Sequence, residues 1–132
     1  MKRSVALVIE GPAGVLLVRR PDDDESLPGV WGLPAASLRE GESELDALLR
    51  AGREKLGVEV EPVVPVGTDE REGHTMRDWA VRVVAGEPQV PQPGSGTQYA
   101  ELRWGDHAEL APAARAGSLC ARALLRAVGS SW

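Results

Sequence analysis

One stretch of the sequence, residues 31–58 (WGLPAASLREGESELDALLRAGREKLGV), restricts the fold more than any other, because both ends of a helix are marked in it. Ser43 is a favoured N-cap residue, and Asp46 three positions later completes a capping-box pattern. Gly57 supplies the left-handed residue that commonly ends a helix. Apolar residues at helical spacing predict its buried face: Leu45, Leu48, Leu49 and Leu56. The opposite face carries charged residues: Asp46, Arg50, Arg53, Glu54 and Lys55.

Segments of strand character lie on both sides of this helix. Ser4 to Glu10 and Val15 to Arg19 predict a hairpin across the turn residues 11–14. Further strands are expected at 31–38, at 58–67 (an edge or bent strand, because it contains two prolines), at 76–85 and at 99–104. A short helical turn at 107–110 and a second long helix at 113–128 complete the chain, while 68–75 is charged and turn-like. Strands interleaved with two helices predict an α/β protein, an α/β/α sandwich around a mixed sheet.

Length and composition limit the class of protein. A chain of 132 residues fits one domain, residues 1–132, with a core that needs no disulfide. The net charge of −5 argues against a nucleic-acid polymer as partner, although a small nucleotide needs only a local basic pocket. The single cysteine, Cys120, fits a reducing compartment and is expected to be a buried thiol. The apolar run after Met1 is too short for a membrane span, so we expect a cytoplasmic protein without membrane contact.

Several common catalytic sites have no counterpart in the sequence. It contains no phosphate-binding loop of the G-x-x-x-x-G-K-[ST] type, no G-x-G-x-x-G, no H-E-x-x-H and no C-x-x-C. Neither His74 nor His107 has a Ser or Cys nucleophile beside it in the sequence, so both are expected to be structural or exposed. What is left is a site centred on carboxylates.

The order W-G-L-P, G-E-S and R-x-x-x-E-K-L-G-V resembles the Nudix family, whose box reads G-x(5)-E-x(7)-R-E-U-x-E-E-x-G-U, with U a bulky aliphatic residue. Five positions match the box: Glu42, Arg50, Glu54, Gly57 and Val58. The L-R-W strand late in the chain is also typical of the family. The resemblance therefore extends over most of the chain.

Four positions of the box differ from the family pattern. Ala36 stands for the first Gly and Gly52 for an aliphatic residue, whereas Ala51 and Lys55 replace two glutamates. Positions 50, 51, 54 and 55 are expected to share one face of the helix, because residues three and four apart are neighbours. The family pattern places a charge of −3 at positions 51, 54 and 55, and here the net charge is zero. A unit charge pair at about 4 Å contributes roughly 4 kcal/mol at an effective dielectric of 20. We therefore expect Mg²⁺ binding by the protein alone to be weaker by several powers of ten.

The resemblance implies the Nudix fold and the hydrolysis of a nucleoside diphosphate-linked molecule or a nucleoside triphosphate. It implies a catalytic role for Glu54 and Arg50, and metal contact for Glu54 and Glu42. The metal would be Mg²⁺, or Mn²⁺, weakly bound or delivered with the substrate, because hard cations take oxygen ligands. Cationic side chains would contact the substrate phosphates: Arg19, Arg20, Arg39 and Lys55.

Three functions stay open at this point: a hydrolase with a reduced Mg²⁺ site, an inactive domain that binds a nucleotide-like or phosphorylated ligand, and a protein-interaction module. Gln98 lies near the position where many relatives carry a further acid. Four other acids are possible substitutes, although the sequence does not place them: Asp69, Glu70, Glu72 and Glu101. The sequence does not name the substrate, because specificity is expected from the loops at 21–28, 68–75 and 87–96. A homodimer is compatible with the sequence but is not indicated by it.

Overall fold

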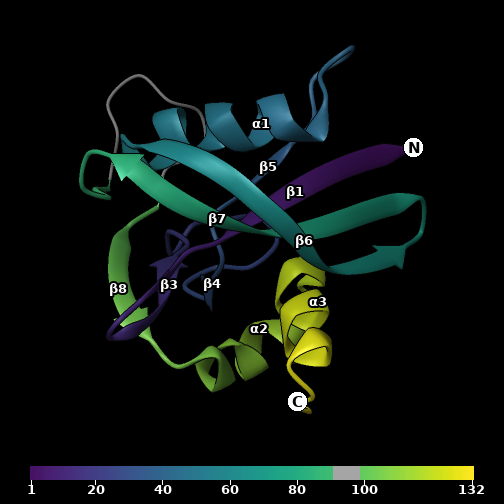
Figure 1. Cartoon of the computed structure of the whole chain (residues 1–132). Coiled ribbons are helices and arrows are strands. Elements are labelled where there is room, and N and C mark those ends of the chain that lie inside the picture. The colour runs from purple at the N-terminus through teal and green to yellow at the C-terminus, as the bar shows by residue number, and fades with distance from the viewer. Residues whose placement is uncertain (91–98) are drawn as a thin grey trace.

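The computed structural model describes residues 1–90 and 99–132 (Figure 1). Its elements follow in this order: β1 (Lys2–Val8), β2 (Glu10–Gly11), β3 (Gly14–Arg19), β4 (Trp31–Gly32), β5 (Ala35–Ser37), α1 (Glu44–Ala51), the π-helix η1 (Gly52–Leu56), β6 (Glu59–Arg71), β7 (His74–Ala85), β8 (Glu101–Gly105), the 3-10 helix η2 (His107–Leu110), α2 (Ala111–Arg115) and α3 (Leu119–Ala127).

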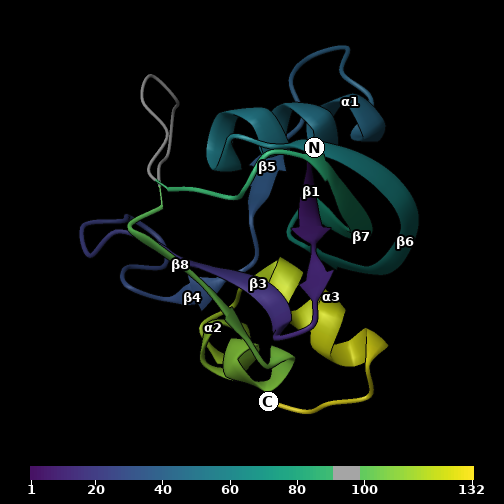
Figure 2. The ribbon, with the colours of Figure 1, turned by 60° about the vertical axis from the view of Figure 1, so that its left-hand side comes forward.

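The main sheet is mixed, as expected from the sequence. Its strand order is β5-β1-β7-β6, with β1 parallel to β7 and the other two pairs antiparallel. A second sheet contains β2, β3 and β4, and β8 pairs with β3. Helix α1 covers one face of the main sheet, and α2 and α3 lie on the other side (Figures 1 and 2). The α/β/α sandwich is therefore confirmed.

Strand β1 shows why both faces of the sheet are covered. Its residues 5–8 are all apolar and at most 2% exposed. Because side chains alternate along a strand, Val5 and Leu7 pack with the core under α1, while Ala6 and Val8 pack with the core under α3. A continuous apolar run of this kind is typical of a strand buried on both faces.

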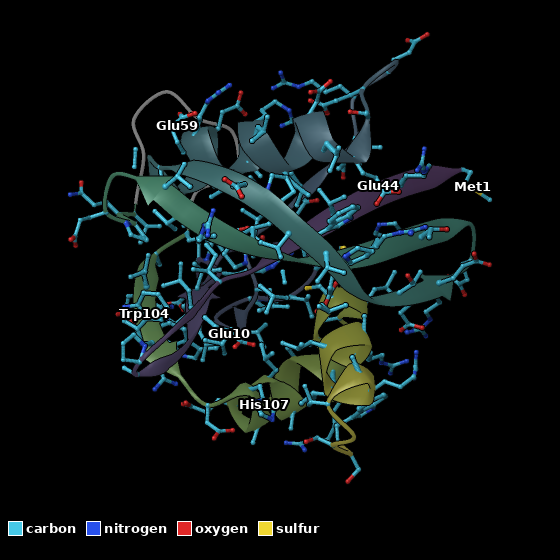
Figure 3. All side chains as sticks on the ribbon, viewed as in Figure 1. Met1, Glu10, Glu44, Glu59, Trp104 and His107 are labelled. Atoms are coloured by element: carbon cyan, nitrogen blue, oxygen red, sulfur yellow. The ribbon has the colours of Figure 1, made fainter. Side chains whose placement is uncertain are left out.

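The first helix begins and ends where the sequence predicts. The Ser43 side chain accepts a hydrogen bond from the Asp46 backbone N–H at 3.1 Å, and Gly57 adopts the left-handed conformation with φ of 70°. Leu45 is an exception to the predicted apolar face, since it is 48% exposed. Glu44 lies in the first turn of α1 (Figure 3). It accepts hydrogen bonds from the Trp79 indole (2.9 Å) and from Arg3 (2.8 Å), which attach the helix to the sheet.

The prediction of a turn-like segment at 68–75 is wrong. Strands β6 and β7 continue to Arg71 and from His74, so that the turn is only Glu72 and Gly73, with φ of 48° and 79°. Two positive φ angles are typical of the tight turns that join twisted strands. This end of the hairpin is largely exposed on both faces, so its strands lack the alternation that would have revealed them.

The second long helix, expected at 113–128, is two helices. It breaks at Ala116 and Gly117, where Gly117 has φ of 104°, and Ser118 then caps α3 by accepting from the Ala121 N–H. Cys120 near the start of α3 is a buried free thiol, as predicted.

The N-terminal strand was expected to run to Glu10, but β1 ends at Val8 and the separate strand β2 begins at Glu10. The apolar run at 5–9 thus belongs to a sheet. Across residues 1–90 and 99–132, none of the helices has both the length and the apolar character needed to span a membrane.

Candidate functional site

An ion pair between Glu42 and Arg50 fixes the loop before α1 to the helix. Arg50 donates from Nε to Glu42 Oε2 (2.8 Å) and from Nη2 to Glu42 Oε1 (2.9 Å), a bidentate arrangement. Arg50 Nη2 also donates to the Ser37 carbonyl (2.8 Å), and the Arg39 N–H donates to Glu42 (2.9 Å). Both side chains are mostly buried, with 16% and 13% of their surface exposed. The Arg50 hydrogen bonds lower the pKa of Glu42 to about 2, so Glu42 is a carboxylate over the physiological range.

Glu54 lies at the outer side of the same network. Its carboxylate is 3.5 Å from Arg50 Nη1 and 3.4 Å from Arg39 Nη2, and 37% of its side chain is exposed. These contacts are longer than the Glu42 pair and involve a solvent-facing arginine, so each contributes little. Glu54 is therefore available to solvent but is held beside two guanidinium groups.

The expectation that positions 50, 51, 54 and 55 share one helix face holds only for Arg50 and Glu54, whose side chains are in contact at 3.5 Å. Ala51 is fully buried in the core, Glu54 faces the arginine network, and Lys55 lines a pocket on another side. Consecutive residues of a helix project roughly a quarter of a turn apart, so Glu54 and Lys55 point to different sides. Gly52 permits the π-helical turn Gly52–Leu56 to approach β6, because a Cβ there would meet the Val60 side chain at 3.2 Å.

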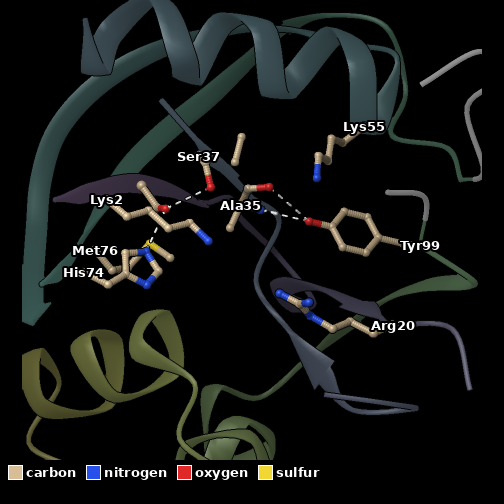
Figure 4. A pocket seen from close by; sticks show the side chains of 10 residues that line it. Lys2, Arg20, Ala35, Ser37, Lys55, His74, Met76 and Tyr99 are labelled. Carbon is tan, nitrogen blue, oxygen red and sulfur yellow. Dashed lines mark hydrogen bonds between the residues drawn. The ribbon is translucent and has the colours of Figure 1, made fainter. Parts of the chain in front are cut away.

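A cavity of about 220 Å³ lies at the edge of the main sheet beneath η1 (Figure 4). We call it the cationic pocket, and it is lined by Lys2, Ser4, Arg20, Ala35, Ala36, Ser37, Lys55, His74, Met76 and Tyr99. The side chains of Lys2, Arg20 and Lys55 point into the same space. Among the described residues that line it, none is acidic.

Lys55 is held over Tyr99 in this pocket. The Lys55 ammonium lies 5.4 Å from the centroid of the Tyr99 ring, within the range of a cation–π contact. Burial lowers the pKa of Lys55, and the nearby Arg20 and Arg50 lower it further. The Tyr99 hydroxyl accepts from the Ala35 N–H (3.0 Å) and donates to its carbonyl (3.3 Å), while burial raises the pKa of Tyr99 to about 12. Tyr99 is thus a neutral, fixed support for the ammonium.

The other end of the pocket contains a serine–histidine contact that sequence reasoning missed. Ser4 Oγ lies 2.8 Å from His74 Nε2, and Ser4 Oγ also donates toward Ser37 Oγ at 3.4 Å. Burial and the nearby Lys2 lower the pKa of His74, which favours the neutral imidazole. Parallel pairing of β1 with β7 brings these residues together, and neighbouring positions in the sequence could not show it.

The predicted phosphate-binding residues fall into two groups. Arg20 and Lys55 line the cationic pocket, and Arg20 also pairs with Asp24 at 3.3 Å. Arg19 pairs instead with Asp22 (3.0 Å) and Glu101 (3.4 Å), and Arg39 pairs with Glu54. Neither Arg19 nor Arg39 is among the residues of the pocket wall. Their contact with a substrate stays a prediction.

A resident magnesium site does not fit the described residues. No group of three His, Cys, Asp or Glu side chains among them is placed to hold a metal ion. Both Glu42 oxygens accept from Arg50, so Glu42 has a partner other than a metal. Ala51 offers no ligand, and Lys55 repels a cation. Glu54 is the one box carboxylate still open to solvent among these positions.

The possible substitute acids are not gathered near Glu54. Asp69 pairs with Arg126 at 3.2 Å, Glu70 accepts from Thr75, and Glu101 pairs with Arg19. Gln98 and most of the loop at 87–96 lie outside the described residues.

Comparisons with known proteins agree with the fold. Residues 1–126 match the family model of the NUDIX domain. The Escherichia coli ORF135 protein is 29% identical, with a TM-score of 0.68 over 97% of this chain and 92% of that chain. A NUDIX hydrolase from Nitrosomonas europaea (19% identity, TM-score 0.71, 97% and 86% covered) and an ADP-ribose pyrophosphatase from Streptococcus suis (18% identity, TM-score 0.67, 97% and 90% covered) share the fold. No curated protein matches the chain.

Proposed function

Because the chain belongs to the Nudix family, as the match over residues 1–126 shows, we propose that it hydrolyses the pyrophosphate bond of a nucleoside diphosphate-linked small molecule or a nucleoside triphosphate. The substrate phosphates occupy the cationic pocket. A Mg²⁺–nucleotide complex, or the Mn²⁺ complex, is the form of the substrate, since residues 1–90 and 99–132 offer no resident metal site.

The observation that supports this proposal is that the ion pairs of Arg50 with Glu42 and Glu54 lie at the wall of the pocket. Arg50 donates to the Ser37 carbonyl, and Ser37 also lines the pocket. Glu54 and Lys55 are consecutive, so a solvent-accessible carboxylate lies next to the residue that enters the cavity. Phosphoryl transfer depends mainly on positioning and on stabilising negative charge, and three cations around one cavity provide both.

Each residue then has a distinct role in the proposal. Arg20 and Lys55 bind phosphate oxygens, and Glu54 is the carboxylate that acts at the reacting phosphate. Arg50 is a positioning residue, because it holds the loop around Glu42 and keeps Glu54 in place. The name of the Streptococcus suis neighbour supports the substrate class, since ADP-ribose is a nucleoside diphosphate joined to a sugar.

A second candidate is binding of the same ligand without turnover. Two observations favour it: Ala51 is fully buried where the family pattern has a glutamate, and Lys55 replaces another. In this case the cationic pocket retains the phosphates, but no group activates water. The domain then acts as a nucleotide-like ligand sensor or as part of a protein interaction controlled by that ligand.

One experiment separates the two candidates. The protein is incubated with a panel of nucleoside diphosphate sugars and nucleoside triphosphates with Mg²⁺ or Mn²⁺, and released phosphate is measured after phosphatase treatment. Hydrolysis predicts turnover that falls by about 100-fold or more in Glu54→Gln. Glu40→Gln, an exposed carboxylate of the neighbouring loop, is the matched control and should keep full turnover.

Two results would overturn the first candidate. Equal turnover in the parent and Glu54→Gln removes the role given to Glu54. Thermal stabilisation by a nucleotide without any phosphate release supports binding alone, because a ligand that binds only the folded state raises its stability.

A further inference from the structure

The cationic pocket is too small for a whole nucleotide and suits its phosphates. Sites that enclose a drug-sized ligand measure about 300–1,000 Å³, whereas this cavity has about 220 Å³. Cations come from three separate elements: Lys2 from β1, Arg20 from the end of β3 and Lys55 from η1. No acid is among the described lining residues, and of the three cations Arg20 also pairs with an acid outside the wall, Asp24 at 3.3 Å.

Neutral hydrogen-bonding groups complete the wall. Ser37 and His74 lie at the end opposite Tyr99 (Figure 4), and Ser4 Oγ is 2.8 Å from His74 Nε2. Hydroxyls and imidazole can donate to phosphate oxygens, which are acceptors only when fully ionised. The pocket therefore offers charge and directed donors on two sides, as expected for a ligand with two linked phosphate groups.

Lys55 is the lining residue that most changes how the pocket interacts with a phosphate, compared with the family pattern. A glutamate at this position would repel a phosphate unless a metal ion stood between them. A lysine attracts the phosphate directly, as an ammonium with three N–H donors. The Tyr99 ring, 5.4 Å away, restricts where the ammonium can lie.

We propose that the cationic pocket binds the pyrophosphate group of its ligand directly, with Lys55 at the position where the family pattern places a metal-holding glutamate, so that binding requires no divalent cation. The ligand class rests on the proposed function. Binding and turnover then differ in their need for a metal. Hydrolysis requires the divalent cation of the nucleotide complex, whereas binding of the phosphates to the pocket does not.

Isothermal titration calorimetry with inorganic pyrophosphate tests this inference. The intact protein is titrated once in EDTA and once in excess Mg²⁺, at the same ionic strength. We expect binding in EDTA, with a Kd no weaker than in Mg²⁺. Lys55→Gln should weaken binding in EDTA by about tenfold or more, equivalent to about 1.4 kcal/mol. Arg115→Gln, which removes one exposed charge of α2 outside the pocket, should bind as the parent does.

Two further variants sharpen the test. Lys2→Gln changes an exposed side chain at the start of β1 and should also weaken pyrophosphate binding, even if changes at Lys55 affect folding. Lys55→Glu should lose binding in EDTA and regain part of it when Mg²⁺ is added, because a carboxylate needs the metal as a bridge.

The results distinguish this inference from the proposed function. Binding in Mg²⁺ but not in EDTA overturns direct recognition and leaves hydrolysis intact. Equal affinity of the parent, Lys55→Gln and Lys2→Gln in EDTA overturns the placement of the ligand. Binding in EDTA that depends on these lysines supports the inference, even if the nucleotide panel shows no turnover.

Discussion

Glu54 and Lys55 are consecutive residues, and they belong to two regions that use charge in opposite ways. On the outer side of the box helix, each of the acids Glu42 and Glu54 contacts an arginine. In the cationic pocket, three cations share a cavity without an acid among the described lining residues. In the first region, the charges of the acids are paired with arginines of the protein, and the Glu42–Arg50 pair stabilises the fold. In the second, Arg20 is also paired with Asp24, while the buried Lys55 ammonium is held in an environment that disfavours its charge.

The largest effect is expected where the first region is broken. Arg50→Ala leaves the mostly buried Glu42 carboxylate without its bidentate partner and frees the Ser37 carbonyl. Removing one partner of a buried pair costs about 3–5 kcal/mol, and we expect about 3 kcal/mol here, because 16% of Arg50 is exposed. Urea denaturation measures the loss.

A matched pair nearby is the control. Arg53 pairs with Glu59 at 2.8 Å, but 58% and 45% of these side chains are exposed. Arg53→Ala should therefore cost less than about 1 kcal/mol. Equal losses for Arg50→Ala and Arg53→Ala would contradict the structural role of the Glu42–Arg50 pair.

Asp78 differs from Glu42 and Glu54, because no hydrogen bond to its carboxylate is found among the described residues. It is fully buried on β7, and neither carboxylate oxygen has a hydrogen-bond partner. Burial, and then the negative charge of Asp69, raise the pKa of Asp78 well above its ordinary value. The folded state therefore binds a proton more tightly than the unfolded state does. Its contribution to stability is complete below pH 3.8 and is lost as the pH rises through the folded pKa.

Asp78→Asn should remove this pH dependence. The asparagine has nearly the same shape but cannot ionise, so its stability relative to the parent should increase between pH 5 and pH 8. The increase follows because only the parent must lose a proton from a buried carboxyl as the pH rises. Urea midpoints of both proteins across this range measure it, and a constant difference would show that Asp78 does not titrate there.

Local signals explain what the sequence predicts well. The Ser43 cap and the Gly57 end are properties of the chain within a few residues, and the Glu42 and Arg50 positions follow from the box pattern. The β6–β7 hairpin was not recognised, because its two-residue turn lies among exposed charged strand residues. The break before α3 had a signal in Gly117 followed by Ser118, a permissive residue and then a cap.

The candidate site was harder to predict than the fold. The family resemblance gave Arg20 and Lys55, but the expectation of one shared helix face placed Lys55 beside Glu54. Consecutive helix residues project roughly a quarter of a turn apart, so Lys55 lines the pocket while Glu54 faces Arg50. Ser4, His74 and Tyr99 reach the pocket through strand pairings and contacts between distant parts of the chain, such as the 64-residue separation between Tyr99 and Ala35. Contacts between residues so far apart in the sequence depend on how the whole sheet is assembled.

Ser43→Ala tests whether the two regions are independent. The Ser43 hydroxyl accepts one N–H of the first turn of α1, and loss of such a cap costs about 1 kcal/mol. The cap is at the opposite end of the α1–η1 helix from Lys55. Thermal unfolding should therefore show the loss, while pyrophosphate affinity at a temperature well below unfolding stays within about twofold of the parent. A parallel fall in affinity would mean that the start of the helix and the pocket form one cooperative unit.

The smallest expected change has the opposite sign. Lys55→Met keeps the length and most of the apolar contact of the side chain but removes an ammonium that burial and two arginines disfavour. We expect the free protein to become more stable by about 0.5 kcal/mol in urea, while pyrophosphate binding is lost. Gains of this kind are common where a binding residue is held in an unfavourable environment for its function. Lys2→Met, which changes an exposed lysine of the same pocket, should weaken binding without the gain in stability. If Lys55→Met were destabilising by as much as Arg50→Ala, Lys55 would belong with the acids of the box helix as a structural charge, and the division between the two regions would be wrong.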